Sequence, residues 1–115
     1  MKLLDQSVLE GLRDVLPEDA LNGLLRQVSR DLIPDSLEAV ALVKAGAWDQ
    51  HQLMIHRLTG TVSSFGCDAL TASLRSVEAG LRAHPLCVPS LEILERIVSV
   101  ARETAAALET AASSC

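Results

Sequence analysis

Residues 46–66, GAWDQHQLMIHRLTGTVSSFG, lie between two glycines and carry apolar side chains at helical spacing. Asp49 stands before this pattern and Gln52 follows three residues later, which resembles a capping box at a helix start. We therefore expect a helix over about residues 50–65. Its second half contains Gly60 with threonines, serines and a valine, all middling or poor helix formers. The sequence thus gives up helix stability in the middle of the helix that it predicts.

A helical wheel with about 100° per residue separates an apolar side from a polar side. We expect the core face to consist of Met54, Leu58, Thr61, Val62 and Phe65. The face toward water is expected to carry Asp49, Gln52, His56, Thr59, Gly60 and Ser63. Leu53 lies about 60° from His56, either at the edge of the core or exposed for a partner, and we favour partner contact. His56 is therefore predicted to be a solvent-facing histidine.

Gly60 follows His56 by one helical turn on the predicted water face. A glycine inside a helix costs about 1 kcal/mol relative to alanine, and on an exposed face core packing does not explain that cost. What the glycine provides is open space beside the imidazole, through which another protein can approach. Because neutral imidazole is a nucleophile, this pattern favours a reactive histidine over a merely polar surface residue.

The chain before Gly46 predicts two helices. A short one is expected over about Ser7–Val15, and a longer one begins at Pro17 with acidic residues in its first turn. Pro34 is expected to kink or break the longer helix near Ile33. The apolar stripe of the longer helix comprises Leu21, Leu24, Leu25, Val28 and Leu32, and resumes at Leu37, Val40 and Ala41.

The chain after the central segment continues with the same periodicity. Gly66 or Cys67 is expected to end the central helix, and Asp68 to cap the next one. Residues 84–89, HPLCVP, predict a loop because they contain two prolines. The apolar face of the helix between these breaks consists of Leu70, Leu74, Val77 and Leu81.

Ser90 is a good N-cap for a last helix. The tail over residues 107–115 has little apolar bulk and is expected to fray. The stripe of this helix comprises Leu91, Leu94, Ile97, Val98, Ala101, Ala105 and Leu108. Four substantial helices with short connections predict an all-α fold, an antiparallel four-helix bundle with a short additional N-terminal helix.

Composition agrees with one helical domain. The 115 residues predict a single unit over residues 1–115, with its core over about residues 18–110. Hydrophobic residues make up 49% and aromatic residues 2%, so the core is aliphatic. A net charge of −5 without a basic run argues against nucleic acid as a partner. No apolar run reaches the ~18 residues of a membrane span, so we expect no direct membrane insertion and a cytoplasmic location.

No metal site or cofactor is predicted. Cys67, Cys87 and Cys115 lack metal-ligand or redox spacing, and we interpret them as ordinary reduced thiols. His51 lies about 140° from His56 on the wheel, so the two cannot share a metal from one helix. The sequence also contains no phosphate-binding loop for ATP.

The stretch HRLTGTVSSFGCDAL, residues 56–70, followed by LRSVEAGLR, residues 74–82, resembles the histidine-containing phosphotransfer (HPt) domains of multistep phosphorelays. Val77 and Glu78 resemble the Leu-Glu pair on the family's next helix, and the stretch GAWDQHQLMIHRL resembles the family's approach to the histidine. The resemblance covers about residues 21–109. The family's pattern H-x-L-K-G-[SA], with a later glycine and leucine, is matched in register by His56, Leu58, Gly60, Gly66 and Leu70.

The resemblance implies that His56 accepts a phosphoryl group from an aspartyl-phosphate on one receiver domain and passes it to the aspartate of another. Response-regulator receivers, including those of a hybrid sensor histidine kinase, are then the partners, and any Mg²⁺ belongs to the receiver. The chain is then a free protein or the C-terminal domain of a membrane-anchored hybrid kinase, and not an autonomous kinase. The docking surface and phosphoryl environment implied by the resemblance consist of Gln52, Leu53, Arg57, Thr59, Gly60 and Ser63.

One position departs from the family. The lysine that usually follows the histidine by three residues is Thr59 here, so the neighbouring cation is missing at that place. Arg57, or Arg75 from the next helix, could supply the charge instead. The departure favours an alternative function, a non-catalytic HPt-like bundle that docks a receiver-type or other regulatory partner without carrying phosphate.

Overall fold

The computed structural model describes residues 1–83 and 89–113, which form five helices and no strand. The predicted all-α class is confirmed. The helices are α1 (Gln6–Val15), α2 (Glu18–Lys44), α3 (Trp48–Ser64), α4 (Asp68–Ala83) and α5 (Leu91–Ser113).

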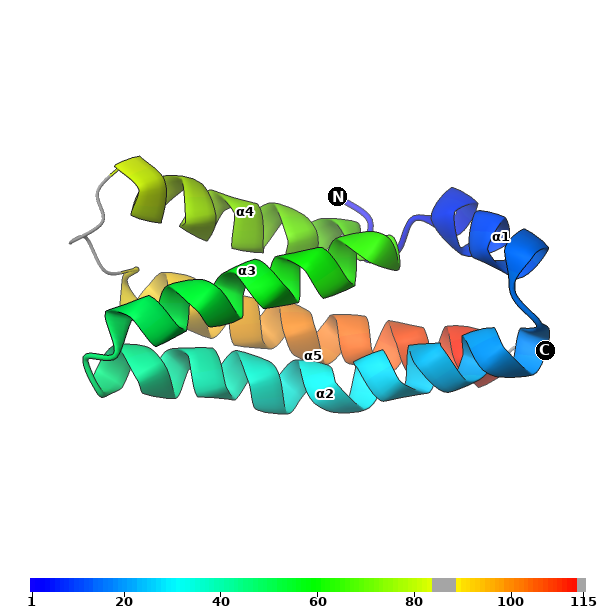
Figure 1. Ribbon diagram of the computed structural model, residues 1–115, viewed down its shortest axis with the longest axis horizontal. Coiled ribbons are helices and arrows are strands. Elements are labelled where there is room, and N and C mark those ends of the chain that lie inside the picture. The colour runs from blue at the N-terminus through cyan, green and yellow to red at the C-terminus, as the bar shows by residue number, and fades with distance from the viewer. Residues whose placement is uncertain (84–88, 114–115) are drawn as a thin grey trace.

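The four longer helices lie lengthwise beside one another, and consecutive ones run in opposite directions (Figure 1). α2 packs against α3 and α5, and α4 packs against the same two helices. The molecule measures 45 × 22 × 21 Å, so its length is close to that of its longest helix. α1 lies across one end, between the α3–α4 turn and the start of α2 (Figure 1).

Two glycines end α2 and α3 in the same way. Gly46 and Gly66 have φ values of +72° and +70°, a left-handed conformation that a residue with a Cβ rarely adopts. The amide of Cys67 donates to the carbonyl of Val62 at 3.0 Å, which closes a Schellman motif around Gly66. Around Gly46, the amide of Ala47 donates to the carbonyl of Leu42 at 2.9 Å in the same pattern. The predicted ends of both helices are confirmed to within one residue.

An aliphatic core runs between the four longer helices. The predicted face of α4 is confirmed, since all four of its members are buried. The buried hydrophobic residues of the other long helices include Leu21, Leu25, Leu32, Ile55, Leu58, Val62, Ile97, Ala101 and Leu108. Leu24 and Leu37, predicted in the stripe of α2, are instead 45% exposed.

Pro34 does not break α2, which runs through it over 27 residues. Of the two outcomes that the sequence predicted here, a kink or a break near Ile33, the break is wrong. A proline inside a helix costs about 3 kcal/mol, but Leu32 and Ala39 on either side of it are buried against the neighbouring helices. Tertiary packing on both sides holds the helix together and outweighs the local preference.

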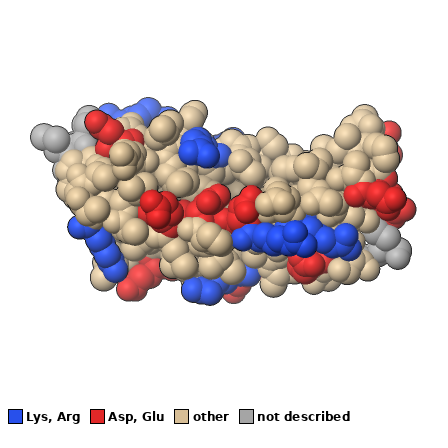
Figure 2. Space-filling model, turned by 60° about the horizontal axis from the view of Figure 1, so that its bottom comes forward, with Lys and Arg blue, Asp and Glu red and all other residues tan. Residues whose placement is uncertain are grey.

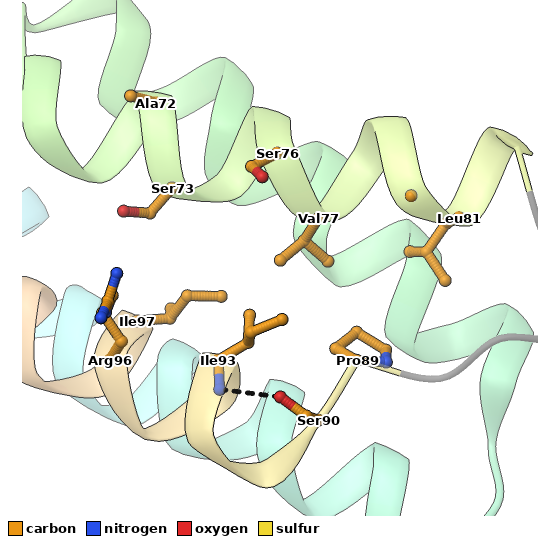
Figure 3. A pocket seen from close by; sticks show the side chains of 11 residues that line it. Ala72, Ser73, Ser76, Val77, Leu81, Pro89, Ser90, Ile93, Arg96 and Ile97 are labelled. Atoms are coloured by element: carbon orange, nitrogen blue, oxygen red, sulfur yellow. Dashed lines mark hydrogen bonds between the residues drawn. The ribbon is translucent and has the colours of Figure 1, made fainter.

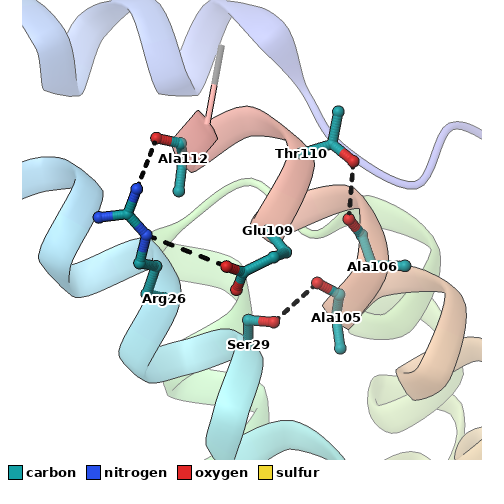
Figure 4. Close-up of polar contacts among 7 residues, drawn as sticks. All are labelled: Arg26, Ser29, Ala105, Ala106, Glu109, Thr110 and Ala112. Carbon is teal, nitrogen blue, oxygen red and sulfur yellow. Dashed lines mark hydrogen bonds and ion pairs between the residues drawn. The ribbon is translucent and has the colours of Figure 1, made fainter. Parts of the chain in front are cut away.

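The C-terminal tail is also more ordered than predicted, because α5 continues to Ser113. Arg26 of α2 donates to the carbonyl of Ala112 at 3.3 Å, and Ser29 donates to the carbonyl of Ala105 at 2.8 Å (Figure 4). Ala112 is buried, so small side chains still contribute to the core here. Residues 114–115 of the tail, and 84–88 of the predicted loop, lie outside the described residues.

The helix starts agree only in part with the predicted caps. Ser90 caps α5 as predicted, with its hydroxyl accepting from the amide of Ile93 at 3.2 Å (Figure 3). Asp49 does not cap α3, because the helix already begins at Trp48 and Asp49 lies in its first turn. In the first turn, its negative charge still interacts favourably with the positive end of the helix dipole. Asp68 is the first residue of α4 rather than its cap.

Acidic and basic side chains lie close together on one face of the molecule. In the view of Figure 2, a short row of basic side chains lies next to acidic side chains along the length of the molecule. Among the described residues, no helix combines the length and the apolar character that crossing a membrane requires.

The N-terminal segment is attached to the turn between α3 and α4. The amide of Asp5 donates to the carbonyl of Gly66 at 2.7 Å, and the amide of Ala69 donates to the carbonyl of Lys2 at 3.1 Å. A Cβ at Gly66 would lie 2.9 Å from the Cβ of Val8 and 3.2 Å from the carbonyl oxygen of Asp5. Gly66 thus serves both the left-handed turn and the close approach of this segment.

Gly66→Ala should therefore destabilise the protein more than Gly46→Ala. Both variants place a Cβ on a left-handed residue, at a cost of about 1 kcal/mol, but at Gly46 the nearest atom lies 4.0 Å away. Crowding against Val8 should bring the total loss for Gly66→Ala to roughly 2–3 kcal/mol. Urea unfolding of both variants measures the difference. Equal losses would show that the N-terminal segment does not constrain this turn.

Candidate functional site

The buried side of α3 is rotated by about 60° on the helical wheel from the predicted one. The residues of α3 that are buried are His51, Ile55, Leu58, Thr59 and Val62. Thr59, predicted to face water, is only 8% exposed, and Thr61, predicted to face the core, is exposed. Both predictions are wrong. Thr59 lies on the side of α3 that packs against α4, and Thr61 lies in an open groove between α3 and α2.

His56 nevertheless faces solvent as predicted. Its side chain is 76% exposed, and its Nδ1 atom lies 3.1 Å from Oε2 of Glu78 on α4, whose side chain is 15% exposed. His56 stands ten residues before Gly66 and Glu78 twelve residues after it. At about 1.5 Å per residue, two helices that leave one tight turn bring these positions to nearly the same height. The turn at Gly66 therefore brings the pair together.

Glu78 is ionised over most of the pH range. Its partial burial alone would raise its pKa, but hydrogen bonds from Thr59 and His56, and the positive charges of His56 and Arg82, outweigh burial and lower the pKa below its ordinary value. The Thr59 hydroxyl has one proton to donate, either to Glu78 or to the carbonyl of Ile55 at 2.8 Å.

The carboxylate determines the tautomer of His56. An ionised carboxylate only accepts hydrogen bonds, so Nδ1 of His56 must carry the proton in this contact. In the neutral ring, Nε2 then holds the free lone pair. The arrangement is that of an accessible nucleophilic nitrogen whose ring is oriented by a partly buried acid.

A shallow groove between α3 and α4 surrounds the pair. Gly60 keeps it open, because a Cβ built there meets no atom within 4 Å. Its lining consists of His56, Thr59, Gly60, Ser63, Arg75, Glu78 and Arg82. A second depression beyond His56 is lined by Asp49, Gln52, Leu53, His56, Glu78 and Arg82.

Most of the site residues predicted from the sequence lie next to His56, and one lies in a separate groove toward α2. Gln52, Leu53, Thr59, Gly60 and Ser63 lie in the two depressions next to His56. Leu53 is 58% exposed, which excludes the core edge, and the partner contact that the sequence favoured stays a prediction. Arg57 instead lines a groove toward α2. There burial and Asp31 raise the pKa of Asp35, and Arg57 acts against them.

Little or nothing in the sequence indicated that three residues of the groove belong to the site. Glu78 entered only through its match to a family pair, Arg75 only as a possible charge donor, and Arg82 not at all. They stand at i, i+3 and i+7 on α4, the spacing of side chains on one helix face. That spacing could have grouped them, but only the packing of α4 on α3 shows that this face meets His56.

Two other reactive side chains take no part in the groove. His51 is 1% exposed and donates from Nδ1 to the carbonyl of Ala39 at 2.8 Å, so it is a core residue joining α3 to α2. Burial, helped by Asp68, raises the pKa of the Cys67 thiol to about 12, which leaves it inert. Within the described residues, no three His, Cys, Asp or Glu side chains are grouped to hold a metal ion.

A larger and more apolar groove lies between α4 and α5, where the side chains of Val77, Leu81 and Ile93 point into the space between the helices (Figure 3). Arg96 is the single ionisable residue in its lining. The described lining contains serine hydroxyls but no histidine or carboxylate that could activate them, so His56 remains the centre of the candidate site.

The sequence matches no protein-family model, no curated protein and no solved structure. The interpretation of the groove therefore depends on its own residues and geometry.

The lowered pKa of Glu78 predicts a pH-dependent contribution to stability. A carboxylate whose pKa is lowered by folding stabilises the protein above its ordinary value of 4.5, and this stabilisation is lost as the pH falls through the folded-state value. Glu78→Gln should thus lower the free energy of unfolding at pH 7, by under about 1 kcal/mol because the imidazole is exposed. The deficit should close as the pH falls below 4.5 toward strongly acidic conditions.

Urea unfolding across this pH range measures the effect. Glu95→Gln, at an exposed position of α5, is the matched control and should show no such trend. A deficit for Glu78→Gln that stays constant with pH, or an equal trend in the control, would contradict the assignment.

Proposed function

We propose that this chain is a histidine-containing phosphotransfer domain, which carries a phosphoryl group on His56 between the aspartates of two receiver domains. One observation carries the proposal: an exposed imidazole on α3, oriented by Glu78 at 3.1 Å, stands beside a helical glycine with open space above it. Gly60 costs stability in an exposed part of the helix, and access to His56 is the benefit that explains its presence.

The helix arrangement supports the same proposal at the level of the fold. α2, α3, α4 and α5 contact one another in sequence order, and α5 closes on α2. We interpret this as an antiparallel four-helix bundle, with α1 as the short additional helix. A site on the solvent face of one helix leaves the aliphatic core undisturbed, and a globular partner can reach it without any opening of the fold.

The forward step uses the lone pair on Nε2 of His56. This nitrogen attacks the phosphorus of an aspartyl-phosphate on the receiver, an N–P bond forms, and the P–O bond to the aspartate breaks, with its electron pair returning to the carboxylate. The ring becomes a cation that still carries the proton on Nδ1. Glu78, which accepts that proton's hydrogen bond, stabilises the positive charge.

The return step is the reverse reaction with a second receiver. Its aspartate attacks the phosphorus, the N–P bond breaks, and the electron pair returns to Nε2. No proton is gained or lost by His56 over the cycle. The receivers supply the Mg²⁺ that screens the phosphoryl oxygens, and the chain acts as an intermediate carrier rather than as a kinase of its own.

His56→Gln should abolish labelling by a phosphorylated receiver. The free energy of unfolding should change by no more than about 0.5 kcal/mol, because the side chain is exposed. Incubation with a panel of phosphorylated receivers, followed by detection of acid-labile phosphate, measures the labelling. Label on the variant, or on His51 or His84 in the parent chain, would exclude His56 as the acceptor.

The same panel separates the proposal from its alternative, a non-catalytic bundle that docks a partner. A parent chain that binds a receiver but never takes label would support the alternative and exclude phosphotransfer.

Gly60→Gln should block receiver docking without loss of stability. A side chain at Gly60 meets no atom within 4 Å, so the variant should be as stable as the parent or gain up to about 1 kcal/mol from helix propensity. Gly23→Gln is the matched control, since Gly23 of α2 is equally unobstructed. Calorimetry and a binding titration on the same samples measure both properties. Unimpaired binding by Gly60→Gln, or equal impairment by both variants, would refute the access role of Gly60.

A further inference from the structure

The groove around His56 contains more positive than negative charge. Arg75 and Arg82 of α4 lie in its lining on either side of Glu78 in the sequence. With Glu78 as the one carboxylate of that lining, this groove holds an excess of one positive charge even when His56 is neutral, whereas the second depression next to His56 also contains Asp49. A phosphoryl group on His56 would carry about two negative charges into this space.

Neither arginine is bound to another carboxylate. Among residues 1–83 and 89–113, the ion pairs join Arg26 to Glu109 and His56 to Glu78, and neither of them includes Arg75 or Arg82. Both side chains are exposed, so their guanidinium groups are free to turn toward an anion in the groove.

Position 59 cannot supply this charge, since it is a threonine that is 8% exposed. Arg57 is directed to a different groove, which it shares with Asp31 and Asp35 of α2. The cations that remain near His56 on the described surface are therefore those of α4.

We propose that Arg75 and Arg82 form the anion subsite that holds the phosphoryl group of phosphorylated His56, so that α4 supplies the positive charge in place of the lysine expected on α3. This inference rests on the proposed function, because it names the groups that bind the phosphoryl oxygens once His56 is modified. Arg82 lines the depressions on both sides of His56, whereas Arg75 lines only the one that contains Gly60 and Ser63. Both arginines therefore border the groove that contains His56 and Gly60, and Arg82 alone also borders the second depression.

The test compares the phosphorylated forms of the parent, Arg75→Gln, Arg82→Gln and the double variant. Arg102→Gln, at an exposed position of α5, is the matched control for loss of one positive charge. The chain is labelled from a phosphorylated receiver, and two properties are measured: the equilibrium constant of transfer from receiver to His56, and the second ionisation of the phosphoryl group by ³¹P NMR.

We expect each single variant to lower the transfer equilibrium constant roughly two- to fivefold, and the double variant about tenfold, because exposed charge pairs are worth under ~1 kcal/mol each. The pKa of the phosphoryl group should rise in the double variant, since removing nearby cations favours its monoanion. The control should match the parent in both measurements. Arg75→Lys and Arg82→Lys should keep most of the effect on the phosphoryl pKa, because they keep the charge.

Three results would overturn these proposals, and they can be told apart. If the parent never takes label on His56, the proposed function fails. If the parent is labelled but the double variant matches it in equilibrium constant and phosphoryl pKa, the anion subsite fails while phosphotransfer stands. If Arg102→Gln changes both properties as much as the groove variants do, the effect is one of overall charge, and the subsite also fails.

Discussion

The left-handed turn at Gly66 is the constraint on which the site depends. Its φ of +70° ends α3, reverses the chain within a few residues and starts α4 at Asp68. Because the turn is short and closed by hydrogen bonds, it determines how α3 and α4 are aligned lengthwise. That alignment brings a histidine and a glutamate 22 residues apart to within 3.1 Å. A longer or looser turn would let the helices slide, and one turn of helix moves a side chain by about 5.4 Å.

Under the proposed function, the His56–Glu78 pair serves chemistry more than stability. A contact between an exposed imidazole and a carboxylate contributes little to folding, since water screens it. Its value lies in what it does to the ring: Glu78 fixes the proton on Nδ1 and leaves Nε2 toward solvent. Under the same proposal, Gly60 costs helix propensity and leaves open space through which a receiver could reach His56. Stability comes from elsewhere, from the aliphatic core between the helices.

The grooves on the two sides of α3, toward α2 and toward α4, differ in their charged residues. In the groove toward α2, Arg57 lies with Asp31 and Asp35, so carboxylates of the protein itself compensate its positive charge. In the groove toward α4 that contains Gly60, Arg75 and Arg82 outnumber Glu78, so that lining carries a net positive charge, although Asp49 lies in the adjoining depression. An unbalanced positive charge next to a nucleophile is the feature that makes the second side suited to an anionic group.

The sequence by itself determined the helices, the positions of their glycine ends, the buried face of α4 and the exposure of His56, because these depend on local periodicity and on backbone conformations that glycine allows. Tertiary structure decided the rest. Helix propensity predicted a kink or break at Pro34 and fraying of the C-terminal tail, yet packing between α2 and α5 extends both helices through these places. A wheel gives the mean direction of the apolar residues of one helix, and it cannot show which neighbour covers each flank. For that reason the helical wheel predicted Thr59 as exposed and Thr61 as buried, whereas the reverse holds. The sequence likewise predicted Arg57 at the site, where Arg75 and Arg82 lie instead.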